Sequence, residues 1–350
     1  MTLSALFLIA IFQSASADQF KIFVTGDGRA EYPDPTDPAH LSPRPEDQKG
    51  INQCTIKDIA DEIVKVRPDV VLWTGDIVNV NYRAGSEASA KSKFFKDGID
   101  AWFEAMAPVY QKQIKVLATR GNHEVVWYDQ NYNPHPIDNA EKIWKDAFSE
   151  TRVLPEETVF DPKHLSFCYA RGPVLLIGLD QYEDEYDEHD VNQQWLEEVL
   201  SRNKTEWKKR FIFAFGHEAA FATSTRHPAS DTLAALPDER DKMLKALNDA
   251  GTKVYLCGHD HFYDRMRVRW AKGGYKMWQI VAGTAGAPFY AKADYPAEKD
   301  WRLERQRHFD FVYGYVLITV EGTKATLEFK GRNLCGYATM DSFDYTVNAP

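Results

Sequence analysis

The sequence predicts an α/β protein in which helices cover mixed β-sheets. Three observations support this prediction. Apolar, β-rich runs alternate with amphipathic helical segments between residues 20 and 257, and the pattern after His261 is mostly β. In addition, five apolar runs end in Gly, and an Asp, Asn or His follows that Gly at once.

Helices are expected where apolar residues recur at helical spacing, and the first should end near Pro68, because proline cannot continue a helix. Asp190 and Gln193 resemble a capping box at the start of the fourth helix. In chain order, the expected helices are Ile51–Val66, Phe94–Met106, Asp138–Phe148, Val191–Leu200 and Asp238–Ala250.

Strands are expected where short runs are rich in β-branched and aromatic residues. Arg171-Gly172-Pro173 and Glu321-Gly322-Thr323 are turns between neighbouring strands. In the alternating section the strands are Phe20–Thr25, Val70–Thr74, Ile114–Thr119, Leu165–Ala170, Val174–Leu179, Arg210–Phe215 and Lys253–Cys257. The later ones are Arg265–Trp270, Tyr275–Ala282, Tyr313–Val320 and Thr326–Lys330.

Length and composition are those of an ordinary globular protein, with 350 residues of which 44% are apolar and 27% charged. The net charge of −10 argues against a nucleic-acid scaffold, which needs a basic surface. There are no internal repeats and no Gly/Ser linker, so residues 18–350 are expected to form one domain.

The N-terminus predicts export. An apolar stretch, Leu3–Phe12, leads into Ala15-Ser16-Ala17, which is typical of a signal-peptidase site. Residues 1–17 are therefore expected to be a cleaved signal peptide, and the mature protein to be secreted or periplasmic. The stretch is shorter than the roughly 18 residues of a spanning helix, so no stable membrane anchor is expected.

The side chains that follow the five glycines predict a metal centre. They are Asp27, Asp76, Asn122, His217 and His259, with His261 two residues further on. In open α/β sheets, ligands bind beyond the carboxyl ends of strands, so these side chains are expected to meet there. Mixed nitrogen and oxygen ligands suit Zn, Mn or Fe, and six of them suit two ions that share a carboxylate. Such a centre would attract a small phosphate ester.

The ordered strings GD, GD, GNHE, GHE and GHDH resemble the calcineurin-like metallophosphoesterase superfamily between Phe20 and His261. The strings YDR at Tyr263–Arg265 and GTAGAP at Gly283–Pro288 resemble the corresponding region of its secreted purple-acid-phosphatase-like branch. The resemblance implies a four-layer α-β-β-α sandwich with two mixed sheets. It also implies that two divalent or trivalent ions (Fe, Mn or Zn) are bound.

The resemblance implies a role for each residue of the centre. Asp76 would bridge the two ions, and His123 would face the leaving group as a general acid or charge stabiliser. Asn122, His217 and His259 would bind one ion, and Asp27 and His261 the other. The implied reaction is in-line attack of a metal-bound hydroxide on phosphorus, with a phosphomonoester as the expected substrate class.

Two positions depart from the family pattern. Arg29 stands where the superfamily commonly has His, and Asn79 stands where purple acid phosphatases have Tyr. Arg29 is always cationic, so it is expected to bind a phosphate oxygen and to leave one ion more weakly held. Asn79, together with Arg226 and His227 in the loop after His217, is a further candidate for substrate binding.

Two alternatives to a phosphomonoesterase stay open. One is a phosphodiesterase acting on nucleotides or lipid head groups, because both reactions use the same ions. The other is a catalytically silent protein that binds metal or phosphate, in which Arg29 has removed the second ion. The acidic run Glu183–Asp190 is expected to be a solvated loop.

Overall fold

The computed structural model describes residues 19–30, 49–81, 88–129, 131, 133–148, 158–183, 189–202 and 210–347. The expected signal peptide and the Pro-rich segment after residue 31 lie outside these ranges. No helix among the described residues is long and apolar enough to cross a membrane.

The first sheet has six strands and mixes parallel and antiparallel pairs. Its parallel part is β1 (Phe20–Thr25), β2 (Val70–Trp73) and β3 (Lys115–Ala118). An antiparallel extension lies on the other side of β1 and consists of β14 (Gly314–Glu321), β15 (Lys324–Asn333) and β16 (Gly336–Thr346). The order across the sheet is β16-β15-β14-β1-β2-β3.

The second sheet has eight strands in the order β13-β11-β12-β10-β9-β8-β7-β6. Its parallel centre is β8 (Val174–Gly178), β9 (Phe211–Phe215), β10 (Val254–Cys257) and β12 (Lys276–Ala282). The flanking strands are β6 (Val159–Phe160), β7 (Phe167–Arg171), β11 (Tyr263–Trp270) and β13 (Trp301–Phe309). A separate hairpin pairs β4 (Val126–Tyr128) with β5 (Pro134–Pro136).

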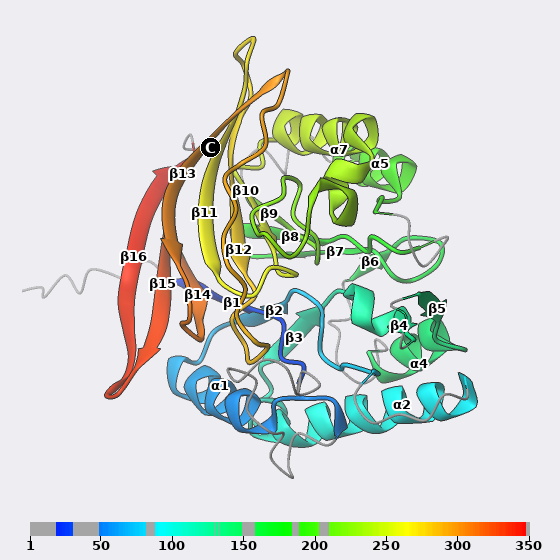
Figure 1. Cartoon of the computed structure of the whole chain (residues 1–350). Helices are drawn as coiled ribbons and strands as arrows, with labels where there is room; N and C mark the ends of the chain where they lie inside the picture. The colour runs from blue at the N-terminus through cyan, green and yellow to red at the C-terminus, as the bar shows by residue number, and fades with distance from the viewer. Residues whose placement is uncertain are drawn as a thin grey trace, which may run out of the picture.

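Helices cover the outer face of each sheet, as Figure 1 shows. The six-stranded sheet packs on α1 (Gln53–Val66), α2 (Ala88–Ala105), α3 (Ala107–Gln111) and α4 (Ala140–Ala147). The eight-stranded sheet packs on α5 (Gln193–Arg202) and α7 (Pro237–Ala250). The third apolar core lies between the sheets. Phe23 faces α1 while its neighbours Ile22 and Val24 face the opposite sheet, because successive side chains of a strand point to opposite faces. The expected four-layer sandwich is confirmed.

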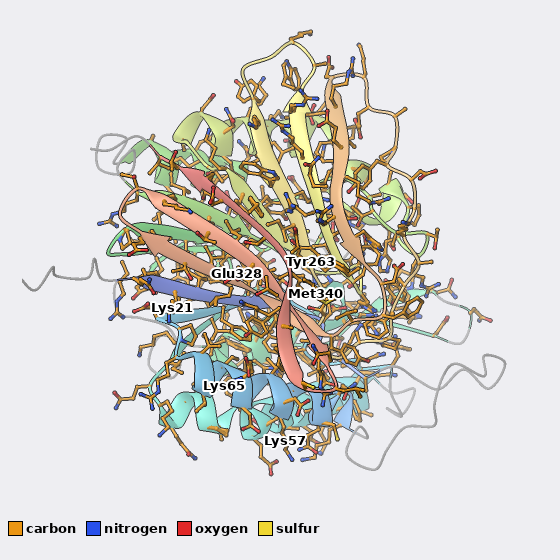
Figure 2. All side chains as sticks on the ribbon, turned by 90° about the vertical axis from the view of Figure 1, so that its left-hand side faces the viewer. Lys21, Lys57, Lys65, Tyr263, Glu328 and Met340 are labelled. Atoms are coloured by element: carbon orange, nitrogen blue, oxygen red, sulfur yellow. The ribbon has the colours of Figure 1, made fainter. Side chains whose placement is uncertain are left out.

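Sequence analysis missed two long strands, β13 and β16. Both are edge strands. β16 exposes much of its length and β13 is mostly half-buried, so neither has the apolar run by which strands were recognised. Figure 2 looks onto this side of the molecule, with Met340 of β16 and Glu328 of β15 labelled. An edge strand covered on one face carries a weak apolar signal, which explains the omission.

The helix boundaries differ from the prediction most at α2 and α5, and by one or two residues at the other expected helices. α2 begins at Ala88, earlier than the expected Phe94. α5 begins at Gln193, and its cap is Asn192, whose Oδ1 accepts the Trp195 N–H at 3.0 Å. Among the described residues, Asp190 accepts the adjacent Val191 N–H and not that of Gln193, so the expected capping box is wrong and the capping residue lies two positions later.

Candidate metal centre

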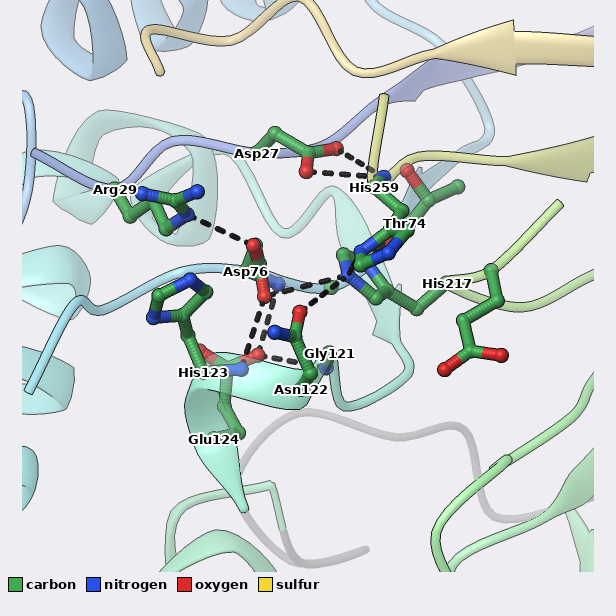
Figure 3. A network of polar contacts seen from close by, with 12 residues as sticks. Asp27, Arg29, Thr74, Asp76, Gly121, Asn122, His123, Glu124, His217 and His259 are labelled. Carbon is green, nitrogen blue, oxygen red and sulfur yellow. Dashed lines mark hydrogen bonds and ion pairs between the residues drawn. The ribbon is translucent and has the colours of Figure 1, made fainter. Parts of the chain in front are cut away.

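The residues predicted to bind metal follow the carboxyl ends of five strands that belong to both sheets. Asp27, Asp76 and Asn122 follow β1, β2 and β3, and His217 and His259 follow β9 and β10. Figure 3 shows these five side chains around one small space. The loops are tied together by backbone bonds, such as Asp27 N to Gly75 O at 3.0 Å and Gly258 N to His217 O at 2.8 Å.

The backbone turns at the ligand residues themselves. Asp27, Asp76 and His259 have φ angles of 60°, 53° and 67°, in the left-handed region that is uncommon for residues other than Gly. Such strain clusters at functional sites, where the surroundings hold it in place. Among the five preceding glycines only Gly75, with φ of 86°, has a positive φ.

The other glycines are needed mainly for close approach. A Cβ on Gly121 would collide with Asp76 Oδ1, and one on Gly258 would collide with Asp27 Oδ2. Four of the five glycines therefore do not supply a turn through a positive φ. Their missing side chains let the loops pack close enough for the ligands to meet.

Glu124 braces two of the loops, those after β2 and β3. Its Oε2 accepts the N–H groups of Gly121 at 2.7 Å and Asp76 at 2.8 Å. Its Oε1 accepts those of Ile77 at 2.9 Å and Val78 at 3.0 Å. A carboxylate offers acceptors only, so it can satisfy four donors at once. Glu124 is fully buried, and it fixes the chain at Asp76 and at the two residues that follow it.

The histidine tautomers can be assigned from their outer partners. His217 Nδ1 lies 2.8 Å from Thr74 O, and His259 Nε2 lies 3.0 Å from Asp231 O. A carbonyl oxygen only accepts, so both of these ring nitrogens carry protons. The remaining nitrogens, His217 Nε2 and His259 Nδ1, are unprotonated in the neutral rings, and they lie 3.0 Å apart.

Two further acceptors converge on this pair. Asn122 Oδ1 lies 3.1 Å and Asp76 Oδ1 lies 3.4 Å from His217 Nε2. Lone pairs that face one another without a proton repel, so the group requires a cation between them. Donor atoms around a single ion with bonds of about 2.1 Å are separated by roughly 3.0–3.4 Å. The residues therefore fit a metal ion at this position.

Burial and neighbouring charges set the protonation states of the centre. Burial, followed by the His227 charge, lowers the pKa of His259 well below its usual value, which keeps its ring neutral. Burial opposes ionisation of Asp76, but His217, His123 and Arg29 outweigh it and hold its pKa well below the usual range. Burial and repulsion from Asp76 raise the pKa of Asp27. A dianionic pair is therefore disfavoured unless cations are present.

A second group of potential ligands consists of Asp27, Asp76 and His261. His261 Nε2 lies 3.6 Å from Asp27 Oδ1. The Arg29 guanidinium lies against this group, with Nε 2.8 Å from Asp76 Oδ2 and Nη2 3.3 Å from His261 Nε2. All six predicted ligand residues are thus close together, but the second group already has a positive neighbour.

Two further histidines border the centre. His123 donates its backbone N–H to Asp76 Oδ1 at 3.2 Å, and Figure 3 places its ring beside Arg29. His227 stacks on His259 with ring centroids 3.7 Å apart, and its Nδ1 lies 3.0 Å from Asp260 Oδ1. Both histidines are thus in contact with residues of the centre.

The other two predicted substrate residues are placed differently. Asn79 is buried, and its Oδ1 accepts the Asn81 N–H at 2.9 Å, so this oxygen shapes a turn. Arg226 is exposed beside the buried His227. The contacts of the described residues place neither side chain against the metal ligands.

Sequence reasoning missed three residues that position the centre. Glu124 and Asp260 belong to the GNHE and GHDH strings, and their position in these motifs could have indicated that they support the centre. Tyr290, whose OH accepts from Arg29 Nη2 at 3.0 Å and whose ring stacks on His261 at 4.0 Å, gave no signal. It lies in the irregular segment after β12 and reaches the site only through the fold.

Comparison with protein families gives two matches. A model described as calcineurin-like phosphoesterase matches residues 51–263. A second, described as iron/zinc purple acid phosphatase-like protein C, matches residues 276–342. None of the curated proteins compared with the chain matches it.

Solved structures with the same fold include three from different organisms. A purple acid phosphatase from yellow lupin seeds has a TM-score of 0.63 at 15% identity, covering 95% of this chain and 54% of that one. A dimetal phosphatase from Danio rerio has a TM-score of 0.55 at 14% identity, covering 94% and 99%. The protein GAP50, described as the anchor in the inner membrane complex of Plasmodium, has a TM-score of 0.54 at 12% identity, covering 94% and 89%. The chain spans about half the length of the lupin protein.

Proposed function

Because the chain belongs to the calcineurin-like phosphoesterase family, we propose that it is a metal-dependent phosphohydrolase that acts on small phosphomonoesters. The observation that carries this proposal is the convergence of four acceptor atoms, from Asp76, Asn122, His217 and His259, without a proton to separate them. A bound Fe, Mn or Zn ion would supply hydroxide near neutral pH and offset phosphate charge.

The protein's own residues would arrange the ester around that centre. The Arg29 guanidinium would add a fixed positive charge beside Asp76, where the phosphate oxygens would lie. His123 and His227, on the border of the site, would give a proton to the departing alkoxide. Asp260 would hold the His227 ring in place through Nδ1. Asp27, Asp76 and His261 form a second group of acceptors beside the first.

Hydrolysis of p-nitrophenyl phosphate and of its bis-ester tests this function. The protein is treated with a chelator and then reloaded separately with Mn²⁺, Zn²⁺ or Fe²⁺. We expect metal-dependent hydrolysis of the monoester, at a rate well above that of the diester. A faster diester reaction would assign the chain to phosphodiesterases, and an Asn122→Ala variant with unchanged activity would remove the hydrolase assignment.

A second candidate is a protein that binds metal or phosphate without turnover. Arg29 favours it, because a guanidinium against Asp76 and His261 opposes a second ion in that position. Two observations argue against this candidate. The acceptor atoms around His217 are all present, and His123 is retained beside Asp76. Metal binding without hydrolysis of either ester after reloading would support this candidate.

We also propose that residues 1–17 are removed on export and that residues 18–350 fold as one domain. The shared core supports the second part, because Ile318 of β14 and Leu327 of β15 pack in the same cluster as Ile22 of β1 and Phe213 of β9. N-terminal sequencing of the protein recovered outside the cytoplasm tests export. An intact Met1 there would contradict cleavage.

A further inference from the structure

Arg29 is buried inside the metal centre, where a long cationic side chain is unusual. Only 3% of it is exposed to solvent. Its Nε donates to Asp76 Oδ2 at 2.8 Å, and its Nη2 donates to Tyr290 OH at 3.0 Å. Charged groups are almost never fully buried unless they are paired, so this position must be held by its partners.

The atoms that Arg29 contacts are also those that would bind an ion in the second position. His261 Nδ1 donates to the Pro288 carbonyl, so the lone pair of His261 lies on Nε2. That lone pair faces Arg29 Nη2 at 3.3 Å. The two carboxylate oxygens of Asp76 have different neighbours. Oδ1 lies 3.4 Å from His217 Nε2, and Oδ2 accepts a hydrogen bond from Arg29. One oxygen therefore serves the first position, and the other pairs with the guanidinium.

We propose that the Arg29 guanidinium is a built-in cation that takes the place of the second metal ion. The chain then binds one ion tightly, between Asp76, Asn122, His217 and His259, and none of comparable affinity at Asp27 and His261. This inference rests on the proposed metal centre, but it does not depend on turnover or on the identity of the ester.

The backbone around Arg29 keeps the guanidinium from moving aside. Arg29 N donates to Asp76 O at 3.1 Å, and Arg29 forms an isolated antiparallel bridge with Ile51. Tyr290 both accepts from Nη2 and stacks on His261, so it covers the group. An ion bound by Asp76 Oδ2 and His261 Nε2 would replace two donor contacts and would lie beside a permanent positive charge.

The consequence for catalysis concerns the charge at the second position and the activation of water. A guanidinium carries one positive charge where an ion would carry two or more. It also cannot activate water as a metal does, so it can orient phosphate but leaves water activation to the first position. A single tight ion and a fixed guanidinium would together face the phosphate.

Metal stoichiometry in the purified full chain tests this inference. Wild type, Arg29→His and Arg29→Lys are equilibrated with Mn²⁺ and dialysed. Bound metal is then measured by elemental analysis and by electron paramagnetic resonance. We expect one uncoupled ion per chain in wild type and in Arg29→Lys. Arg29→His, which removes the permanent charge and adds a ligand, should bind two ions with an exchange-coupled spectrum.

Two ligand variants provide a second readout if Arg29→His fails to fold. His217→Ala should lose the single ion, with at least a tenfold fall in Mn²⁺ affinity, whereas His261→Ala should keep it. Two tight ions in wild type would overturn the inference and leave the hydrolase proposal standing. One ion in wild type without hydrolysis of either ester would instead contradict the hydrolase and support the inference.

Discussion

Replacement of Glu124 by Gln tests how the metal loops are held. The carboxylate accepts four backbone N–H groups, two on each oxygen. An amide keeps one oxygen, so Glu124→Gln retains one pair of bonds and turns an NH₂ group toward the other two donors. The variant changes no atom of the proposed ligands, so its effect isolates the positioning role of Glu124.

The magnitude follows from the two bonds that are lost. Burial and repulsion from Asp76 raise the pKa of Glu124 to about 8, so it is ionised in the metal-free chain above that pH. A hydrogen bond to a charged group contributes about 1.5–3 kcal/mol, so the free energy of unfolding measured there should fall by about 3–6 kcal/mol. Either Gly121 and Asp76 or Ile77 and Val78 would lose their acceptor. Because both pairs hold the loop of Asp76, metal affinity should fall as well, by about 10–100-fold as for other residues that support ligands. The losses of stability and of metal affinity should therefore occur in the same variant.

The assay is urea unfolding of the metal-free chain, with metal affinity measured separately by chelator competition. Glu321→Gln is the matched control, because Glu321 is exposed at the end of β14 and its change should stay within about 0.5 kcal/mol. A Glu124→Gln variant as stable as Glu321→Gln would refute the bracing role. Lower stability with unchanged metal affinity would show that Glu124 stabilises the fold without positioning the metal ligands.

Three further predictions concern the ligands, the leaving group and pH. Asn122→Ala should lower Mn²⁺ affinity at least tenfold in chelator competition, with the circular dichroism spectrum unchanged; an unaltered affinity would exclude Asn122 as a ligand. His227→Gln should slow hydrolysis of an alkyl phosphomonoester by about 10²–10⁴-fold and that of p-nitrophenyl phosphate less, because only the alkoxide needs a proton; equal losses would assign His227 to binding. Burial and a hydrogen bond with Asp161 raise the pKa of Glu183 from 4.5 to about 8, so the folded chain binds a proton that the unfolded chain has released. The urea midpoint of the wild type should therefore fall as pH rises from 4.5 to about 8. Glu183→Gln should show a smaller fall, and parallel curves for the variant and the wild type would contradict this role of Glu183.

Glu183 also shows where the charge pattern misled sequence analysis. The acidic run was expected to be a solvated loop, but Glu183 is buried and accepts from Asn192 Nδ2 at 3.0 Å. Residues 184–188 lie outside the described ranges. A run of like charges usually indicates solvent, and a long-range partner such as Asp161 cannot be recognised from spacing along the chain.

The convergence of the candidate ligands was predictable because it depends on local sequence. Each of Asp27, Asp76, Asn122, His217 and His259 follows a buried strand and a Gly, and parallel strands end at the same edge of a sheet. The family prediction is confirmed by the match over residues 51–263. What these residues do in catalysis stays a proposal.

The rest of the centre depends on contacts between distant parts of the chain. Tyr290 reaches Arg29 across 261 positions, and Asp260 reaches His227 across 33. The spacing of Arg29 from Asp27 predicted a departure from the family pattern, but not that its guanidinium lies between Asp76 and His261. Contacts of this kind follow from the packing of the two sheets.

The central claim is that loops from both sheets hold a metal ion at Asp76, Asn122, His217 and His259. Anomalous diffraction from crystals of the Mn²⁺-loaded chain tests it most directly. The account predicts a peak bonded to His217 Nε2 and His259 Nδ1, within reach of Asn122 Oδ1 and Asp76. A map in which these atoms surround no peak, while Mn²⁺ is bound elsewhere or not at all, would contradict it.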